Sequence, residues 1–188
     1  KMWRNLYSIV RGDQFLFSSQ YLQGSLTING NSYKNILLNY DIYNDEILTP
    51  KKDGSIIQLN KEMVDSFTMV LDGKTYRFVN AQEDRLPVIK GYVKVLYRGK
   101  CSLYVKYKKK IEELAVDNKY DKFFRTYRIY FLKDGKVQQI SSKSDLLKVL
   151  QEDKTRIKDF MKKNKLKVSR TEPESFIPVI RYYDSLSR

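Results

Sequence analysis

Residues 92 to 107 read Tyr-Val-Lys-Val-Leu-Tyr, then Arg-Gly-Lys, then Cys-Ser-Leu-Tyr-Val-Lys-Tyr. Two runs rich in β-branched and aromatic residues flank a turn that contains glycine, which is the pattern of a β-hairpin. An odd-length loop at 98–100, or a five-residue loop around it, leaves one face of this hairpin wholly apolar. A two-residue loop would divide the apolar residues between both faces, so burial favours the odd loop. The pairs predicted on the apolar face are Val93 with Val105, Val95 with Leu103 and Tyr97 with Cys101.

The opposite face of the predicted hairpin combines tyrosine with positive charge, because the same register places Tyr92 across from Lys106 and Lys94 across from Tyr104. Residues 123–132 repeat this combination on a second strand, where apolar and polar residues alternate. We therefore predict a Tyr/Lys face that either lies under C-terminal helices or binds an anionic partner, and we expect the helices to cover it. The candidate binding residues are Tyr92, Lys94, Tyr104, Lys106, Arg128 and Tyr130.

The rest of the chain to about residue 140 also alternates, and its turns contain glycine after Asn or Asp, residues that tolerate the positive φ of tight hairpins. Short connections between successive strands favour antiparallel neighbours. The predicted strands are 22–28, 33–43, 46–49, 55–59, 64–71, 74–79, 88–97, 101–108, 123–132 and 136–140. We expect a charged hairpin tip or loop at 108–121.

After residue 140 the apolar spacing becomes helical. Ser142 or Ser144 can cap a first helix that runs to about Lys163, and a second helix begins near 171–175 and ends at Leu186. We therefore predict a mainly β (α+β) fold, an antiparallel meander or flattened barrel with two C-terminal helices packed on or beside the sheet. The 188 residues are expected to form one domain, with a lead-in (1–20), a β body (21–140) and a helical section (141–188).

The composition argues against most enzyme classes. Histidine is absent, so the commonest general base and transition-metal ligand is missing, and one cysteine allows no disulfide or paired-thiolate site. Asp41, Asp45 and Glu46 lack the ligand spacing of a calcium loop, and their pattern is better explained as turn chemistry. We expect no enzymatic activity, no catalytic residue, no cofactor and no metal site. Cys101 is expected to be a buried apolar residue rather than a nucleophile.

The net charge of +14 and the pI near 9.6 indicate attraction to polyanions such as nucleic acid, anionic polysaccharide or lipid head groups. No stretch approaches the roughly 20 apolar residues of a membrane span, so we expect no transmembrane segment in this chain. Scarce cysteine together with abundant lysine and tyrosine suits an exported bacterial protein. An extracytoplasmic location, periplasmic or secreted, is therefore expected.

Five short segments carry a resemblance to other proteins. They are 24–26 (Gly-Ser-Leu), 33–35 (Tyr-Lys-Asn), 38–46 (Leu-Asn-Tyr-Asp-Ile-Tyr-Asn-Asp-Glu), 163–166 (Lys-Asn-Lys-Leu) and 180–183 (Ile-Arg-Tyr-Tyr). In these segments the chain resembles uncharacterised exported β-rich proteins of gut bacteria. The resemblance implies an envelope or secreted location, and it brings no catalytic residue with it.

Two functions follow from these observations. The first is a non-enzymatic binding or structural protein of the bacterial cell envelope, whose partner is an anionic polymer or another envelope protein. The second is a protein that binds nucleic acid or another polyanion through the Tyr/Lys face. A steep fall of affinity with salt would favour the second function.

Overall fold

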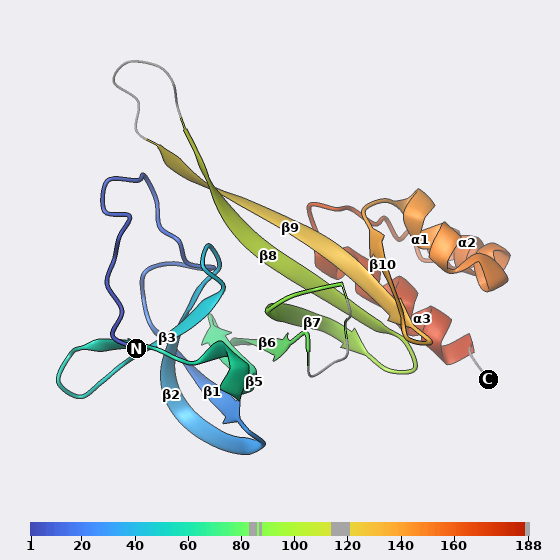
Figure 1. The fold of residues 1–188 in the computed structure, drawn as a ribbon. Helices are drawn as coiled ribbons and strands as arrows, with labels where there is room; N and C mark the ends of the chain where they lie inside the picture. Colours follow the sequence, from blue (N-terminus) through green and yellow to red (C-terminus); the bar gives the residue numbers. More distant parts are fainter. Residues whose placement is uncertain (83–85, 87, 114–120, 187–188) are drawn as a thin grey trace.

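The computed structural model describes residues 1–82, 86, 88–113 and 121–186, and within these residues ten strands form one open antiparallel sheet (Figure 1). The strand order is β10-β9-β8-β7-β6-β5-β1-β2-β3-β4. The strands are β1 (Leu22–Ile28), β2 (Asn31–Asp41), β3 (Glu46–Pro50), β4 (Ile56–Gln58), β5 (Val64–Leu71), β6 (Lys74–Asn80), β7 (Tyr92–Arg98), β8 (Ser102–Glu112), β9 (Lys122–Lys133) and β10 (Lys136–Ile140).

The sheet consists of two meanders, one from β1 to β4 and one from β5 to β10, joined by antiparallel pairing of β1 with β5. A 3₁₀ turn, η1 (Lys61–Met63), leads from β4 into β5. Three hairpin turns have Asn-Gly or Asp-Gly with positive φ at both residues, as at Asn29 (47°) and Gly30 (78°). The predicted mainly β, antiparallel architecture is confirmed. The expectation of a single domain stays a prediction.

The hairpin of β8 and β9 is longer than predicted and forms a twisted arm (Figure 1). Its strands pair without a register shift from Ser102 with Leu132 out to Glu112 with Lys122. The charged segment 108–121, expected to be an extended hairpin tip or a loop, therefore continues the hairpin as strand to Glu112, and its residues 114–120 lie outside the described residues. On this arm even-numbered residues share one face and odd-numbered residues share the other.

The C-terminal section is helical, as predicted. Its elements are α1 (Lys143–Val149), η2 (Gln151–Asp153), α2 (Lys154–Lys163), η3 (Pro173–Phe176) and α3 (Ile177–Leu186). Ser142 caps α1, because its side chain accepts a hydrogen bond of 3.1 Å from the Asp145 N–H. The helix predicted to run to Lys163 is interrupted at Leu150, where the backbone leaves the helical region (φ −103°, ψ 29°). No helix in the described part of the chain combines the length and apolar character needed to cross a membrane.

The helices cover the odd-numbered, apolar face of β8 and β9. Leu103, Val105, Ile129 and Phe131 are all at most 1% exposed, and they pack against the apolar sides of α1, α2 and α3. This placement corrects the expectation that the helices cover the Tyr/Lys face. Burial of this face stabilises the fold by roughly 1.5 to 3 kcal/mol for each large side chain.

The register of the β7–β8 hairpin differs from the prediction. Val95 lies opposite Tyr104 and Tyr97 opposite Leu103, with a bulge at Leu96 between them. The hairpin loop is 99–101, flanked by the pair of Arg98 with Ser102, rather than 98–100. The predicted pairs are therefore wrong on both faces.

The bulge turns Val93 and Val95 to the Tyr104 side of the sheet and turns Lys94 to the helix side. The register was predicted by assuming that one face of β7 is buried. Both faces are buried here, because Ala81, Leu86 and Ile89 pack over the face opposite the helices. Burial therefore does not penalise a division of the apolar residues between the two faces.

Truncation of the helix cover tests how much it stabilises the sheet. Phe176→Ala, in the fully buried η3 position, should lower the free energy of unfolding by about 3 to 5 kcal/mol because it opens a cavity. Phe124→Ala is a matched control, because Phe124 is 55% exposed on the arm. Urea unfolding should show a much smaller loss for the control, and equal losses would contradict the described packing.

Candidate functional site

A groove of about 560 Å³ lies over the even-numbered face of β8 and β9, beside the loop that connects β6 to β7. Its lining combines five cationic side chains with tyrosine and apolar residues. The lining residues are Val88, Ile89, Lys90, Lys106, Lys108, Lys110, Thr126, Tyr127, Arg128 and Tyr130. None of these described lining residues is acidic. We name it the basic groove.

One wall of the basic groove is formed by Val88, Ile89 and Lys90, in the loop that precedes β7. Just before β7, the Gly91 carbonyl accepts a hydrogen bond of 2.8 Å from the Ala81 N–H. Leu86 and Ile89 anchor the loop, because both are buried in a cluster with Val93 and Tyr104. Anchoring by these residues leaves Val88 (73% exposed) and Lys90 facing outward.

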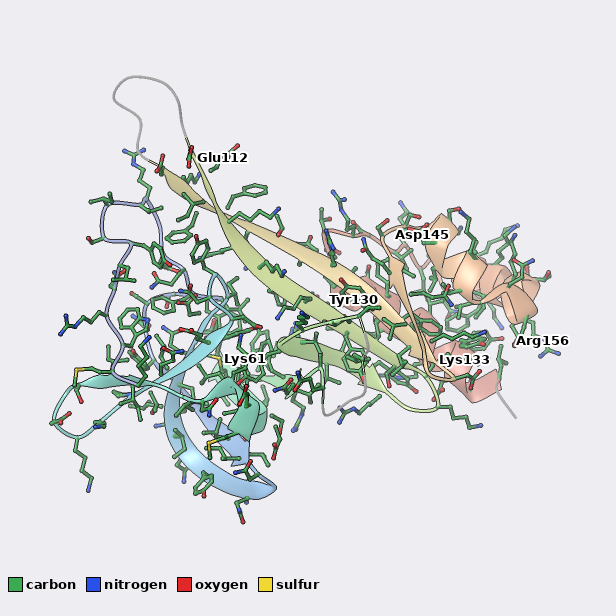
Figure 2. The ribbon with its side chains drawn as sticks, in the orientation of Figure 1. Lys61, Glu112, Tyr130, Lys133, Asp145 and Arg156 are labelled. Carbon is green, nitrogen blue, oxygen red and sulfur yellow. The ribbon has the colours of Figure 1, made fainter. Side chains whose placement is uncertain are left out.

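The floor of the basic groove is formed by cross-strand pairs of β8 and β9. Tyr104 pairs with Tyr130 and Lys106 with Arg128, and Lys108 lies across from Thr126. These four predicted residues, Tyr104, Lys106, Arg128 and Tyr130, share one face, as the sequence pattern indicated. Tyr130 is labelled in Figure 2 near the middle of the molecule, and Glu112 near the outer end of the arm, so the face follows the length of the hairpin.

The other two predicted residues are not on this face. Lys94 lies opposite Val105 and Phe78, on the helix side, where its ammonium group forms an ion pair of 2.6 Å with Glu174. Tyr92 is buried in the N-terminal aromatic cluster, with its ring 5.8 Å from that of Tyr40. The bulge in β7 is the reason, since it reverses the face of residues before it.

Lys106 differs from the other groove cations because it is buried and paired. Its ammonium group donates to Asp45 Oδ1 (2.8 Å) and to the Tyr92 carbonyl (2.9 Å), and only 6% of its side chain is exposed. Asp45 also accepts from the Tyr40 hydroxyl (2.6 Å) and from Lys61 (3.2 Å). The carboxylate therefore links the β2–β3 turn to η1, β7 and β8. We call this arrangement the Asp45 cluster.

The surroundings of Asp45 keep its carboxylate ionised. Burial alone would raise the pKa of Asp45, but the nearby Lys106 ammonium and the hydrogen bonds to the carboxylate outweigh burial and lower the pKa. Burial raises the pKa of Tyr40 well above its ordinary value, so this residue donates as a neutral phenol. Gly91 has a φ of 73° and packs so closely that a Cβ there would collide with the Asp45 carboxylate. The Asp45 cluster is therefore tightly built and structural.

Asp41, beside the Asp45 cluster, caps a turn rather than holding an ion. Its carboxylate accepts hydrogen bonds from the Tyr43 N–H (3.0 Å), the Asn44 N–H (2.9 Å) and the Asn44 side chain (2.9 Å). These contacts are an Asx turn at the end of β2. In the described ranges, no group of three acidic or cysteine side chains is placed to hold a metal ion.

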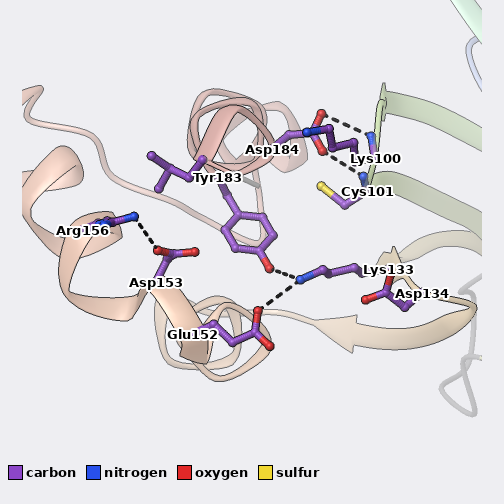
Figure 3. Close-up of a pocket in the computed structure, with 10 residues that line it drawn as sticks. Lys100, Cys101, Lys133, Asp134, Glu152, Asp153, Arg156, Tyr183 and Asp184 are labelled. Carbon is purple, nitrogen blue, oxygen red and sulfur yellow. Dashed lines mark hydrogen bonds and ion pairs between the residues drawn. The ribbon is translucent and has the colours of Figure 1, made fainter. Parts of the chain in front are cut away.

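A second cavity, of about 710 Å³, lies where the β7–β8 loop meets α3 (Figure 3). Asp184 accepts hydrogen bonds from the Tyr97 hydroxyl (2.8 Å) and the Cys101 N–H (3.0 Å), which fixes the loop. Across the cavity, Lys133 donates to the Tyr183 hydroxyl and to Glu152 (3.3 Å). Cations and carboxylates on this lining pair with each other, so the cavity is the joint between hairpin and helices rather than a site of unbalanced charge.

The residues that the sequence did not reveal are those of the groove wall and of the Asp45 cluster. Val88 and Lys90 belong to the segment 88–97, which the sequence predicts to be strand. The sequence signal for a loop in this segment is Gly91, a turn residue that directly follows Lys90. Asp45 was interpreted as turn chemistry, and its contact with Lys106 joins positions 61 residues apart. Comparison with protein-family models, with curated proteins and with solved structures finds no match for this chain.

Replacement of the central carboxylate tests the Asp45 cluster. Asp45→Asn leaves Lys106 buried without its countercharge, so the free energy of unfolding at pH 7 should fall by about 3 kcal/mol. Because the folded pKa of Asp45 is lowered, its stabilisation is present above the ordinary pKa near 3.9 and is lost as the pH falls through the folded value. The gap between parent and variant should therefore narrow below about pH 4.

The measurement is urea unfolding at several pH values. Asp72→Asn is the matched control, because Asp72 sits in an exposed turn with φ 50°, which asparagine also adopts. The control should change the free energy of unfolding by less than about 0.5 kcal/mol. Equal stability of Asp45→Asn and the parent at pH 7 would contradict the role of the cluster.

Cys101 should resist thiol reagents in the folded protein. It is 2% exposed beside Leu103, and burial raises the pKa of its thiol to about 12, so little thiolate exists at neutral pH. Iodoacetamide at pH 7.5 should modify it only after denaturant is added, as followed by mass spectrometry. Rapid modification of the native protein would show that the β7–β8 loop opens away from α3.

Proposed function

We propose that this protein is a non-enzymatic binding protein that holds an anionic polymer in the basic groove. The observation that carries the proposal is a row of exposed cations without countercharges. Within the described residues, Lys90, Lys108, Lys110 and Arg128 form no ion pair, although all four line one groove. Closely spaced like charges repel one another, and a bound polyanion removes that repulsion.

Edge protection is the structural alternative to ligand binding for these lysines. Lysines often protect the exposed edge of a sheet, and β8 pairs with β7 only from Ser102 to Val105, so Lys108 and Lys110 lie beyond that pairing, where β9 is their partner strand. Lys106 shows what a structural lysine does here, since it is buried and bound to Asp45. Lys108 and Lys110 continue the same row outward with exposed side chains. Their positions suit contact with a ligand.

Location is a separate proposal. An extracytoplasmic protein would meet anionic envelope polymers, and a cytoplasmic one would meet nucleic acids. The basic groove supports binding in either place, so the predicted export stays a prediction. Fractionation of cells that express the full-length gene, followed by immunodetection, would test it.

Neutralising the groove should weaken polyanion binding. The triple variant Lys108→Gln, Lys110→Gln, Arg128→Gln removes three exposed cations, and we expect affinity for heparin at 0.15 M salt to fall by more than about tenfold. The matched control is Lys34→Gln, Lys52→Gln, Lys163→Gln, which removes the same charge from exposed positions outside the groove lining.

Affinity is measured by isothermal titration calorimetry and by the salt concentration that elutes each variant from immobilised heparin. Thermal unfolding of both triple variants should match the parent, because the replaced residues are exposed. If both triple variants lose affinity equally, binding depends on net charge alone and the groove is not the site.

A further inference from the structure

We propose that the polymer held in the basic groove is single-stranded nucleic acid, with its phosphates along the lysines of β8 and its bases stacked on Tyr130 and Phe124 of β9. This inference rests on the proposed function and names its ligand. It follows from two features of the arm, which are the spacing of its cations and the position of its aromatic rings.

The exposed cations lie along the strands of the arm. Lys108 and Lys110 occupy alternate positions of β8, so their side chains leave the same face about 6.8 Å apart, outward of Lys106, whose ammonium group is bound to Asp45. Arg128 lies directly across from Lys106 on β9. A row of this kind follows the backbone of an extended polyanion and does not enclose a compact anion.

Aromatic rings flank the row on the neighbouring strand. Phe124 lies across from Lys110 and is 55% exposed, while Tyr130 lines the groove two positions beyond Arg128. Both are even-numbered residues of β9, so they share the face of the lysines. Covering the exposed ring of Phe124 would bury apolar surface and so favour binding. A ligand that carries flat apolar rings would cover it.

These features favour unpaired bases over other polyanions. Single-stranded nucleic acid is bound by positively charged grooves in which bases stack on aromatic side chains, and this mode tolerates any sequence. In a duplex the bases are stacked on each other inside the helix, so they cannot reach Phe124 or Tyr130. Sulfated polysaccharide offers charge without a planar base, and an anionic membrane would contact Val88 and Phe124 together. The experiment distinguishes these ligands.

The first part of the experiment compares different ligands bound to the parent protein. Fluorescence anisotropy is measured with a labelled 15-residue oligothymidine, with an abasic phosphodiester chain of equal length, with a 15-base-pair duplex and with heparin. We expect the oligothymidine to bind at least about fivefold more tightly than the abasic chain, because each stacked base adds affinity. If each of the four exposed groove cations contacts one phosphate, the slope of log affinity against log salt concentration should be about −3 for the oligothymidine.

The second part of the experiment compares variants of the protein. Tyr130→Leu and Phe124→Leu keep an apolar side chain but remove the ring, and each should weaken the oligothymidine about fivefold or more while leaving the abasic chain and heparin unchanged. Tyr33→Leu, at a tyrosine 48% exposed on β2, is the matched control and should change nothing. Lys108→Gln with Lys110→Gln should reduce the salt slope by about 1.4 for both oligomers.

The outcomes separate this inference from the proposed function. If the abasic chain and the oligothymidine bind equally, or if the duplex binds as tightly, the groove recognises charge alone and the inference is overturned while the proposed function stands. Heparin binding without oligothymidine binding, or binding to phosphatidylserine vesicles that Val88→Ser and Phe124→Leu abolish, also overturns it. If none of these polyanions binds, both proposals fail.

Discussion

The contact between the Asp45 carboxylate and the Lys106 ammonium is the interaction on which the rest of the structure depends. It joins the turn after β2 to the middle of β8, and so holds the curled N-terminal meander against the long arm. Lys61 and Tyr40 complete the coordination of the carboxylate, which offsets the cost of burying two charges. Because Lys106 also lies at the inner end of the basic groove, the same contact fixes the position from which the exposed lysines extend.

The bulge at Leu96 explains why this sheet has two different covered faces. Before the bulge, Lys94 turns to the helices and pairs with Glu174 of η3, while Val93 and Val95 turn toward Leu86 and Ile89. Each face of β7 then has its own partner, helices on one side and loop on the other. Without the bulge, Lys94 rather than Val93 and Val95 would face Leu86 and Ile89. The loop that forms the groove wall would then lose its apolar contacts with β7.

Much of the fold could be predicted from local chemistry. Strands such as Leu22–Ile28 and Val64–Leu71 were predicted at their observed bounds, since alternation and Asn-Gly or Asp-Gly turns act over a few residues. The register of β7 on β8 could not be predicted in this way, because both faces of β7 are buried by residues distant in sequence, the C-terminal helices on one side and Leu86 and Ile89 on the other. For the same reason four of the six predicted site residues share a face, while Tyr92 and Lys94 do not.

The lysines of β8 that share one face have two different environments, buried beside a carboxylate or exposed at the surface. At Lys106 the chain supplies a buried carboxylate, so the charge is neutralised and becomes part of the core. At Lys108 and Lys110 the side chains are exposed, and Thr126 and Phe124 lie across the strand. In the described part of the chain these two lysines form no ion pair, so like charges repel one another beside an exposed aromatic ring. A ligand that combines negative charge with flat rings would neutralise the charges and cover the ring, which is the physical basis for proposing single-stranded nucleic acid as the ligand of the groove.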